Sequence, residues 1–146
     1  MNVIVVGVDG SDHSLAALRY ALSLARDGDA VVRVVTAWHV PSLTYAAGVV
    51  TGDLAAELEE AATQAQEDAL TAAASATDGL TVQRSVQEGD AGHVLVAESE
   101  SADMLVVGSH GHGEIGELVL GSASHYCCRH ARCPVVVIPH GALVVS

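Results

Sequence analysis

Two stretches rich in glycine and hydroxyl groups carry the residues best suited to bind an anion. Gly108-Ser109-His110-Gly111 follows a short apolar run, and Gly121-Ser122-Ala123-Ser124 begins after nine intervening residues. Glycines let backbone amides approach an anion closely, and the N–H groups and hydroxyls at a helix start suit phosphate. The spacing therefore indicates a phosphate-binding loop that ends on a helix N-terminus.

A third candidate is the segment Val8-Asp9-Gly10-Ser11-Asp12, which follows the first apolar run. A strand-to-helix turn explains most of it, because Gly10 suits a tight turn, Ser11 can cap a helix and Asp12 suits a first helical turn. Asp9 fits less well, since a carboxylate at the mouth of a buried strand needs a partner. A ligand contact and a purely structural turn are the two interpretations of Asp9.

Imidazoles and thiols gather between positions 110 and 133, which raises the possibility of zinc. They are His110, His112, His125, Cys127, Cys128, His130 and Cys133. No Cys-x2-Cys pair occurs, so core thiols are the preferred interpretation. A helix from Ser122 would turn one stripe inward, made of Ala123, Tyr126, Cys127 and His130. No Gly-x-Ser-x-Gly nucleophile motif occurs either, and we predict no catalytic residue.

Composition narrows the classes of function. The 146 residues suit one domain, 1–146, and the formal charge of −12 argues against nucleic-acid binding. All six cations are Arg, so the chain has no Walker A lysine. Neither a basic leader nor an apolar run long enough for a membrane is visible, and the odd cysteine count does not suggest a disulfide framework. We expect a cytoplasmic protein without a membrane partner.

Five short apolar runs are expected to form strands, and the stretches between them have helical periodicity. The strands are predicted at 3–8, 30–37, 80–86, 104–107 and 135–138, with helices after Ser11, from about 52 to 77, after Asp90 and from Ser122. This alternation predicts an α/β fold, a doubly wound parallel sheet with helices on both faces. Ligands bind such sheets beyond the carboxyl ends of the strands, so function should lie after strands one, two and four.

Further expectations concern the elements around the carboxyl ends of the strands. The helix from about 52 should turn Leu54, Leu58, Ala61 and Ala65 inward and leave Glu57, Glu60, Gln64 and Glu67 in solvent. Residues 42–52 suggest a mobile loop beside the site. His13 and His39 are expected at the surface or at the mouth of the site.

The glycine spacing Gly-x2-Gly-x9-Gly-Ser, with Val-Asp-Gly-Ser before it and Cys-Pro-Val-Val-Val after it, resembles the universal stress protein family. The resemblance covers essentially the whole chain. It implies a Rossmann-like, five-stranded sheet in the order 3-2-1-4-5, a homodimer paired through strand five, and the ATP-binding branch of the family. It also implies a regulatory role in stress with an unknown signalling partner.

Position by position, the resemblance implies roles for twelve residues. Asp9, Gly10 and Ser11 would lie beside the nucleotide, and the backbone of Ala37 would meet the adenine edge. Gly108, Ser109, His110 and Gly111 would contact ribose and phosphates, while Gly121, Ser122, Ala123 and Ser124 would hold the phosphate tail with Mg²⁺. Family members often place Arg or Lys after the second glycine, but this chain has His112, Glu114 and Glu117 there. His110 and His112 are then the side chains that could supply positive charge.

Three functions follow from these patterns. A regulatory protein that binds ATP is preferred, a nucleotide-free dimeric scaffold of the same fold is the first alternative, and a slow ATP hydrolase is the second. The sequence offers no obvious general base or arginine finger for hydrolysis.

Overall fold

The computed structural model describes residues 2–41, 47–48, 52–110 and 120–139. Five parallel strands form one sheet in the order β3-β2-β1-β4-β5, which confirms the predicted fold class and strand order. The strands are β1 (Val3–Gly7), β2 (Val31–Trp38), β3 (Val82–Glu88), β4 (Met104–Gly108) and β5 (Val135–Ile138).

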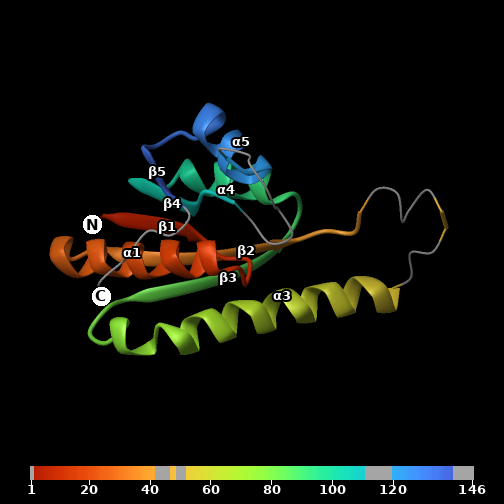
Figure 1. The fold of residues 1–146 in the computed structure, drawn as a ribbon, viewed down its shortest axis with the longest axis horizontal. Coiled ribbons are helices and arrows are strands. Elements are labelled where there is room, and N and C mark those ends of the chain that lie inside the picture. Colours follow the sequence, from red (N-terminus) through yellow and green to blue (C-terminus); the bar gives the residue numbers. More distant parts are fainter. Residues whose placement is uncertain (1, 42–46, 49–51, 111–119, 140–146) are drawn as a thin grey trace.

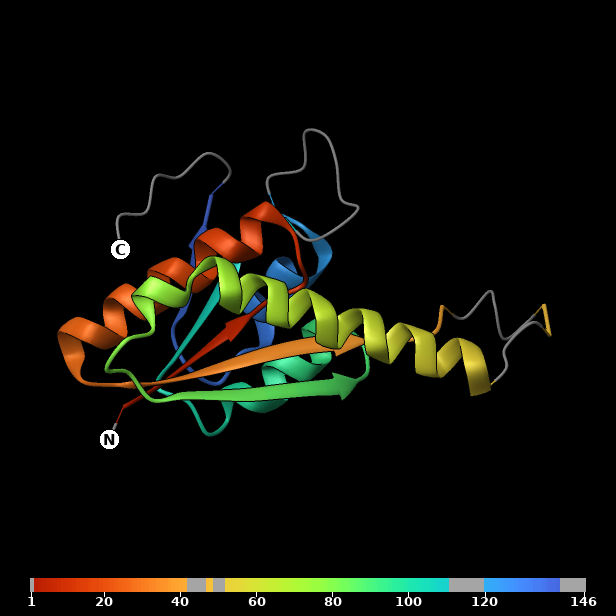
Figure 2. The same ribbon diagram turned by 90° about the horizontal axis from the view of Figure 1, so that it is seen from below.

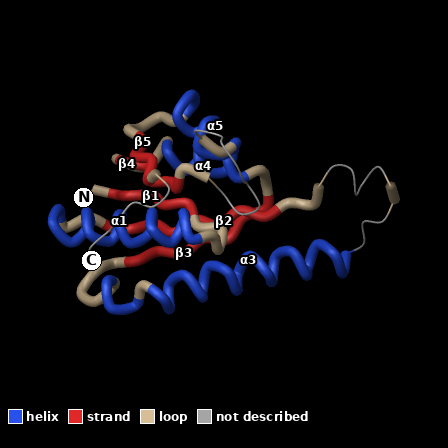
Figure 3. Tube along the Cα trace, in the orientation of Figure 1, coloured by secondary structure: helices blue, strands red, loops and turns tan. Residues whose placement is uncertain are grey.

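Helices cover both faces of the sheet, as the alternation of elements predicts. They are α1 (Asp12–Gly28), α3 (Gly52–Ala72), α4 (Ala91–Ser99) and α5 (Ser122–His130), with a short 3₁₀ turn at Ala74–Ala76. Helices α1 and α3 lie on one face and α4 and α5 on the other (Figure 1; Figure 3). The carboxyl ends of the strands therefore meet at one edge, between two helical layers.

The side chains of β1 show how the sheet builds two cores. Ile4 and Val6 pack toward α1, while Val5 packs toward α4. On the α1 side, Leu18 and Leu22 are fully buried. Strands buried on both faces read as continuous apolar runs, which is why β1, β2 and β4 were recognisable in the sequence.

Local hydrogen bonds fix where two helices begin. The Ser11 hydroxyl accepts from the backbone N–H of Ser14 at 3.1 Å, and the Asp90 carboxylate accepts from the N–H of His93 at 3.2 Å. Both N-caps confirm the sequence prediction. The hydrogen bond from the His93 side chain lowers the pKa of Asp90 below its ordinary value.

Helix α3 differs from the prediction in the face that it buries. Ala62, Gln66 and Ala69 are its buried residues, whereas Leu54 and Leu58 are half-buried and Ala61 is exposed. The N-terminal part of α3 extends past the ends of the strands, so no sheet lies beneath its first turns (Figure 2). The predicted stripe was wrong at its first two residues because no sheet lies beneath them, and at Ala61 and Ala65 because these residues line the space between α1 and α3. The expected solvent face, including Glu57 and Glu60, is exposed.

Buried Gln66 fastens α3 to the sheet. Its amide nitrogen donates to the Ser85 carbonyl at 2.9 Å and to the Thr36 hydroxyl at 3.1 Å, and its oxygen accepts from Arg84 at 3.2 Å. A buried amide that meets partners on two strands fixes the position of the helix over β2 and β3.

The predicted inward stripe of α5 is correct only in part. Cys127 is fully buried, but His130 is exposed, and the Tyr126 ring lies 4.4 Å from the rings of both His93 and His130. Burial raises the pKa of the Cys127 thiol to about 12, so this cysteine is an unreactive core thiol.

Of the other two thiols, Cys133 is half-buried and packs against the core on the α4–α5 side, whereas Cys128 is exposed and is not a core residue. Within the described ranges, no group of three or more His, Cys, Asp or Glu residues could hold a metal ion. No helix in those ranges is long and apolar enough to span a bilayer.

Candidate functional site

A small cavity opens where the carboxyl ends of β1, β2 and β4 meet α4 and α5. Its volume is about 70 Å³. The lining residues are Gly7, Val8, Asp9, Ser14, Val35, Ala37, Ala91, Leu95, Val107, Gly108, His110, Ala123 and Ser124. The sequence predicted a site at this edge, and six of the twelve predicted site residues line the cavity: Asp9, Ala37, Gly108, His110, Ala123 and Ser124. It did not predict the apolar side chains of Val35, Leu95 and Val107.

The turn after β1 is held together by its own polar groups. One oxygen of the Asp9 carboxylate accepts from the N–H of Ser11 at 2.9 Å and from the Ser11 hydroxyl at 2.6 Å. The N–H of Asp9 donates to the Ser14 hydroxyl at 3.1 Å. Gly10 has φ +90°, a conformation that L side chains rarely adopt. The structural turn thus accounts for Ser11 and Gly10, while Asp9 belongs to both the turn and the cavity.

The two glycine motifs meet through Ser109. Its carbonyl accepts from the N–H of Gly121 at 2.6 Å and from the Ser124 hydroxyl at 2.8 Å. Ser109 and Ser124 are both buried, and Ser122 is exposed. These contacts set the N-terminus of α5 beside the end of β4.

Helix α5 begins differently from α1 and α4. Gly121 occupies its N-cap position with an extended backbone, and no side-chain hydrogen bond caps it in the described part of the chain. Helix N-termini carry unsatisfied N–H groups and partial positive charge, which favour an anion.

Gly108 is needed for packing as well as for the cavity. A Cβ atom there would lie 2.8 Å from the backbone carbon and oxygen of His13, so the start of α1 sits directly against the end of β4. This approach brings His13 to His110, with ring centroids 5.5 Å apart in an edge-to-face arrangement. His13 is half-buried, and from the sequence we expected it only at the surface or at the mouth of the site. Its position in the first helical turn after strand one could have indicated that it lies close to the site.

Some predicted features lie outside the described residues. They are Gly111, His112, Glu114 and Glu117 of the second-glycine loop and most of the loop at 42–52.

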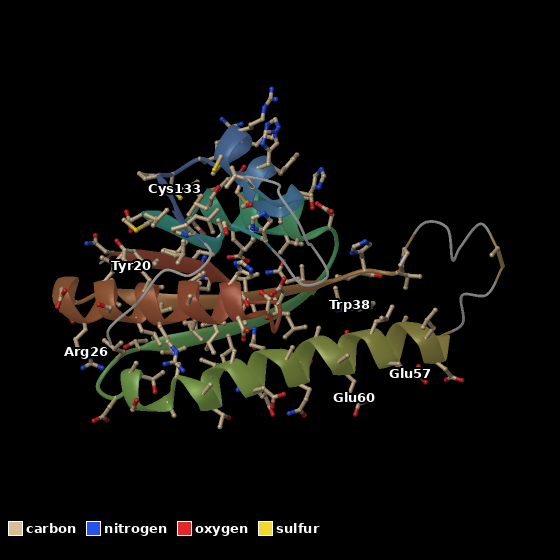
Figure 4. The ribbon with its side chains drawn as sticks, in the orientation of Figure 1. Tyr20, Arg26, Trp38, Glu57, Glu60 and Cys133 are labelled. Atoms are coloured by element: carbon tan, nitrogen blue, oxygen red, sulfur yellow. The ribbon has the colours of Figure 1, made fainter. Side chains whose placement is uncertain are left out.

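Two large side chains follow one another at the end of β2. His39 is exposed, whereas the indole N–H of Trp38 is buried without a hydrogen-bond partner among the described residues. Trp38 lies between the end of β2 and α3 (Figure 4).

A second and larger cavity of about 480 Å³ lies on the α1–α3 side of the same edge. Its lining residues are Asp9, Gly10, Ser11, Asp12, Leu15, Thr36, Ala37, Ala61, Ala62, Ala65, Asp68, Ala69 and Ala72. Gly10 and Ser11 therefore line this cavity rather than the first, although the resemblance placed them beside the nucleotide. Asp9 and Ala37 line both cavities and form a shared wall.

Comparisons with known proteins agree with this architecture. The chain is 36% identical over 141 residues to a universal stress protein of Mycolicibacterium smegmatis, covering 94% of this chain and 48% of that protein. It therefore spans about half the length of that relative. The solved structure of the hypothetical protein MJ0577 superposes with a TM-score of 0.80 at 21% identity, covering 97% of this chain and 98% of the other.

A universal stress protein solved in complex with cAMP superposes with a TM-score of 0.67 at 30% identity, covering 94% of this chain and 96% of the other. The family model described as the universal stress protein family matches residues 1–139. The chain belongs to the universal stress protein family.

Proposed function

We propose that this chain binds an adenine nucleotide, ATP in the first instance, in the small cavity and acts as a nucleotide-responsive regulatory protein. One observation carries the proposal: an apolar cavity opens directly beside a helix N-terminus that no described side chain caps. An apolar wall suits a base, and helical N–H groups suit the phosphates attached to it.

The base would lie against Val35, Leu95 and Val107, with the backbone of Ala37 at its edge. The cavity of about 70 Å³ is smaller than the roughly 300–1,000 Å³ typical of ligand pockets. Side chains that line the cavity, such as those of His110 and Leu95, must therefore move when a base enters. The nucleotide would select an opened form of the pocket.

The phosphates would supply a cap at the N-terminus of α5, where no described side chain supplies one. Repulsion by a chain of net charge −12 opposes this, and no Arg or Lys lies between Arg84 and Arg129. Among the described residues, His110 lines the cavity and His13 contacts His110, and both imidazoles can carry positive charge. Mg²⁺ would enter with the phosphates, because Mg²⁺ keeps several waters and needs few protein ligands.

A relative supports this reading of the cavity. The solved universal stress protein that holds cAMP shares 30% identity with this chain over nearly its whole length.

We propose that the bound nucleotide regulates the protein and is not turned over, with slow ATP hydrolysis as the alternative to be measured. Release of inorganic phosphate from ATP over hours distinguishes the two.

Titration of the purified protein with ATP, AMP and cAMP, with and without Mg²⁺, tests the proposal. Trp38 is the single tryptophan and adjoins Ala37, so its fluorescence can report binding alongside calorimetry. Gly121→Val should abolish nucleotide binding while the circular dichroism spectrum is unchanged, because a side chain would occupy the approach to the helix N-terminus. Gly52→Val, at the start of α3 and outside both cavities, is the matched control.

A second variant protects the test against misfolding of Gly121→Val. Ala123→Met places a longer side chain on the cavity wall and should also weaken nucleotide binding. Mass spectrometry of gently purified protein adds an independent measurement: co-purified ATP or AMP would exclude the nucleotide-free scaffold. Absence of binding by wild type to all three nucleotides would leave that scaffold as the function.

A further inference from the structure

The second cavity differs from the first in both its shape and its charge. It is a trough between α1 and α3, which diverge over the carboxyl ends of β1 and β2 (Figure 2). Its volume of about 480 Å³ falls within the range of roughly 300–1,000 Å³ that holds small organic ligands. The volume is concave rather than flat, so it suits a small molecule.

The floor and the rim of this trough have opposite character. Alanine side chains of α3, with Leu15 of α1, give an apolar floor, and carboxylates of Asp9, Asp12 and Asp68 stand among the lining residues. None of the residues lining the cavity, all of which are described, carries a positive charge. In a chain of net charge −12, such a trough attracts cations and repels anions such as nucleotides.

Two of the three carboxylates, those of Asp12 and Asp68, form no salt bridge with a described arginine. Asp68 accepts a hydrogen bond from neutral Gln64 at 2.8 Å. Arg19, which leaves α1 toward α3, donates to the Ala72 carbonyl at 3.2 Å. Arg19 therefore places one positive charge at the Ala72 end of the trough, and the carboxylates of Asp12 and Asp68 leave negative potential over the rest of it for a ligand to balance.

We propose that this trough binds a small organic cation: an ammonium, amidinium or guanidinium group on an apolar body. The charged group would lie near Asp12 and Asp68, and the apolar body would cover the alanine floor and Leu15. A bare metal ion fits less well, because methyl groups supply no ligands and the described residues gather no cluster of three ligating side chains. The polar Thr36 hydroxyl at the sheet end already holds Gln66.

Because Asp9 and Ala37 line both cavities, a ligand bound in the trough should affect binding in the small cavity. An occupant of the trough would contact Asp9 and Ala37 from the α1–α3 side, and these residues also line the small cavity. Cation binding would then shift nucleotide affinity, and by linkage the nucleotide would shift cation affinity by the same factor. The cation site itself does not depend on nucleotide binding, so it can be tested in nucleotide-free protein.

The test is a titration of ¹⁵N-labelled, nucleotide-free protein with three probes of one shape and different charge. They are benzamidinium, neutral benzamide and anionic benzoate. Benzamidinium should move the amide signals of Gly10, Leu15 and Ala65, which line the trough, and the other two probes should bind several-fold more weakly. Equal binding of benzamide, or benzamidinium shifts confined to other surfaces, would overturn the proposal.

Two pairs of variants separate a specific site from general attraction to an acidic protein. Asp12→Asn should weaken benzamidinium binding about two- to fivefold, the effect of losing one exposed ion pair. Asp53→Asn, which removes the equivalent first-turn carboxylate of α3 outside the trough, should leave it unchanged. Equal weakening by both variants would show only non-specific attraction and would refute the site.

The second pair tests the trough by filling it. Ala61→Phe places a ring in the trough from an exposed position on α3 and should abolish benzamidinium binding. Ala56→Phe, exposed on the same helix but outside the trough, should not. Unchanged binding by Ala61→Phe would place the cation elsewhere. Since neither residue lines the small cavity, failure here leaves the nucleotide proposal standing.

Discussion

At the scale of single residues, Gly108 and Gly7 end adjacent parallel strands but meet different neighbours. A Cβ at either position would lie 2.8 Å from another atom. For Gly108 that atom belongs to the backbone of His13, whereas for Gly7 it is the end of the flexible Leu95 side chain. A backbone cannot move aside as cheaply as a methyl group, so the two glycines are not equivalent.

Gly108→Ala should therefore destabilise the protein by about 1–3 kcal/mol, the usual cost of overpacking. Gly7→Ala should be nearly neutral, because Leu95 can adjust and alanine reduces the entropy of the unfolded chain. Urea denaturation of both variants measures the difference. Equal losses would show that α1 is not fixed against the end of β4.

His13 and His110 form the other notable pair at this scale. His13 lies in the first turn of α1, and His110 lies two residues after the end of β4. The two rings meet because Gly108 lets the start of α1 lie directly against the end of β4. Their contact places two imidazoles beside the proposed phosphate site. An imidazole in a model peptide titrates near pH 6.5, and a neighbouring phosphate favours its protonated form.

Nucleotide affinity should therefore rise as pH falls from about 8 to about 6, because binding takes up protons. The effect should be larger without Mg²⁺, which neutralises the same phosphates. His110→Ala and His13→Ala should each flatten this pH dependence. His39→Ala is the control and should not, because His39 is exposed directly after β2. Calorimetric titrations at pH 6 and 8 decide the matter; a response shared by all variants would remove the two histidines from the site.

At the scale of elements, the anchoring of α3 decides the shape of the second cavity. The helix is held over β2 and β3 by Gln66, whose amide meets groups on both strands. Arg19 of α1 donates to the carbonyl of Ala72, the last residue of α3, and Arg26 donates to the carbonyl of Ala76 in the 3₁₀ turn that follows. These contacts hold the C-terminal half of α3 near α1 and let its N-terminal half extend away, which opens the trough.

Gln66→Leu should destabilise the protein by about 1–3 kcal/mol, because the Ser85 carbonyl and the Arg84 side chain lose a buried partner. The exposed Gln64→Leu on the same helix should change the stability by less than about 0.5 kcal/mol. Chemical denaturation measures the unfolding free energy of both variants, and unchanged m-values show that the comparison with the wild type is valid. A neutral Gln66→Leu would mean that apolar packing alone holds α3.

At the scale of the whole molecule, the two edges of the sheet differ. The edge strand β3 exposes Gln83, Arg84 and Glu88, and such charged edges resist pairing. The opposite edge, β5, consists of Val135–Ile138, and its three valines are only half-buried. An apolar edge strand favours pairing with a second copy.

We therefore expect a two-fold dimer paired through β5. Light scattering at micromolar concentration should give twice the chain mass of 14.9 kDa. Val137→Lys should yield monomers, while Gln83→Lys on the β3 edge should leave the dimer intact, and thermal melts confirm that both variants fold. A monomeric wild type would contradict the pairing.

The sequence by itself determined the order and type of the elements and the caps at Ser11 and Asp90. These features depend on local causes: apolar runs that suit buried strands, side chains that accept from nearby N–H groups, and the rule that parallel strands end at one edge. Such signals lie within a few residues of the structure that they specify.

Tertiary structure decided what depends on residues distant in the chain. The buried face of α3 follows from where the sheet ends beneath it, and the contact of His13 with His110 follows from the space at Gly108. The division of predicted site residues between two cavities follows from the divergence of α1 and α3. Periodicity shows that a helix has an apolar side, but only packing against the sheet fixes how far along the helix that side is covered.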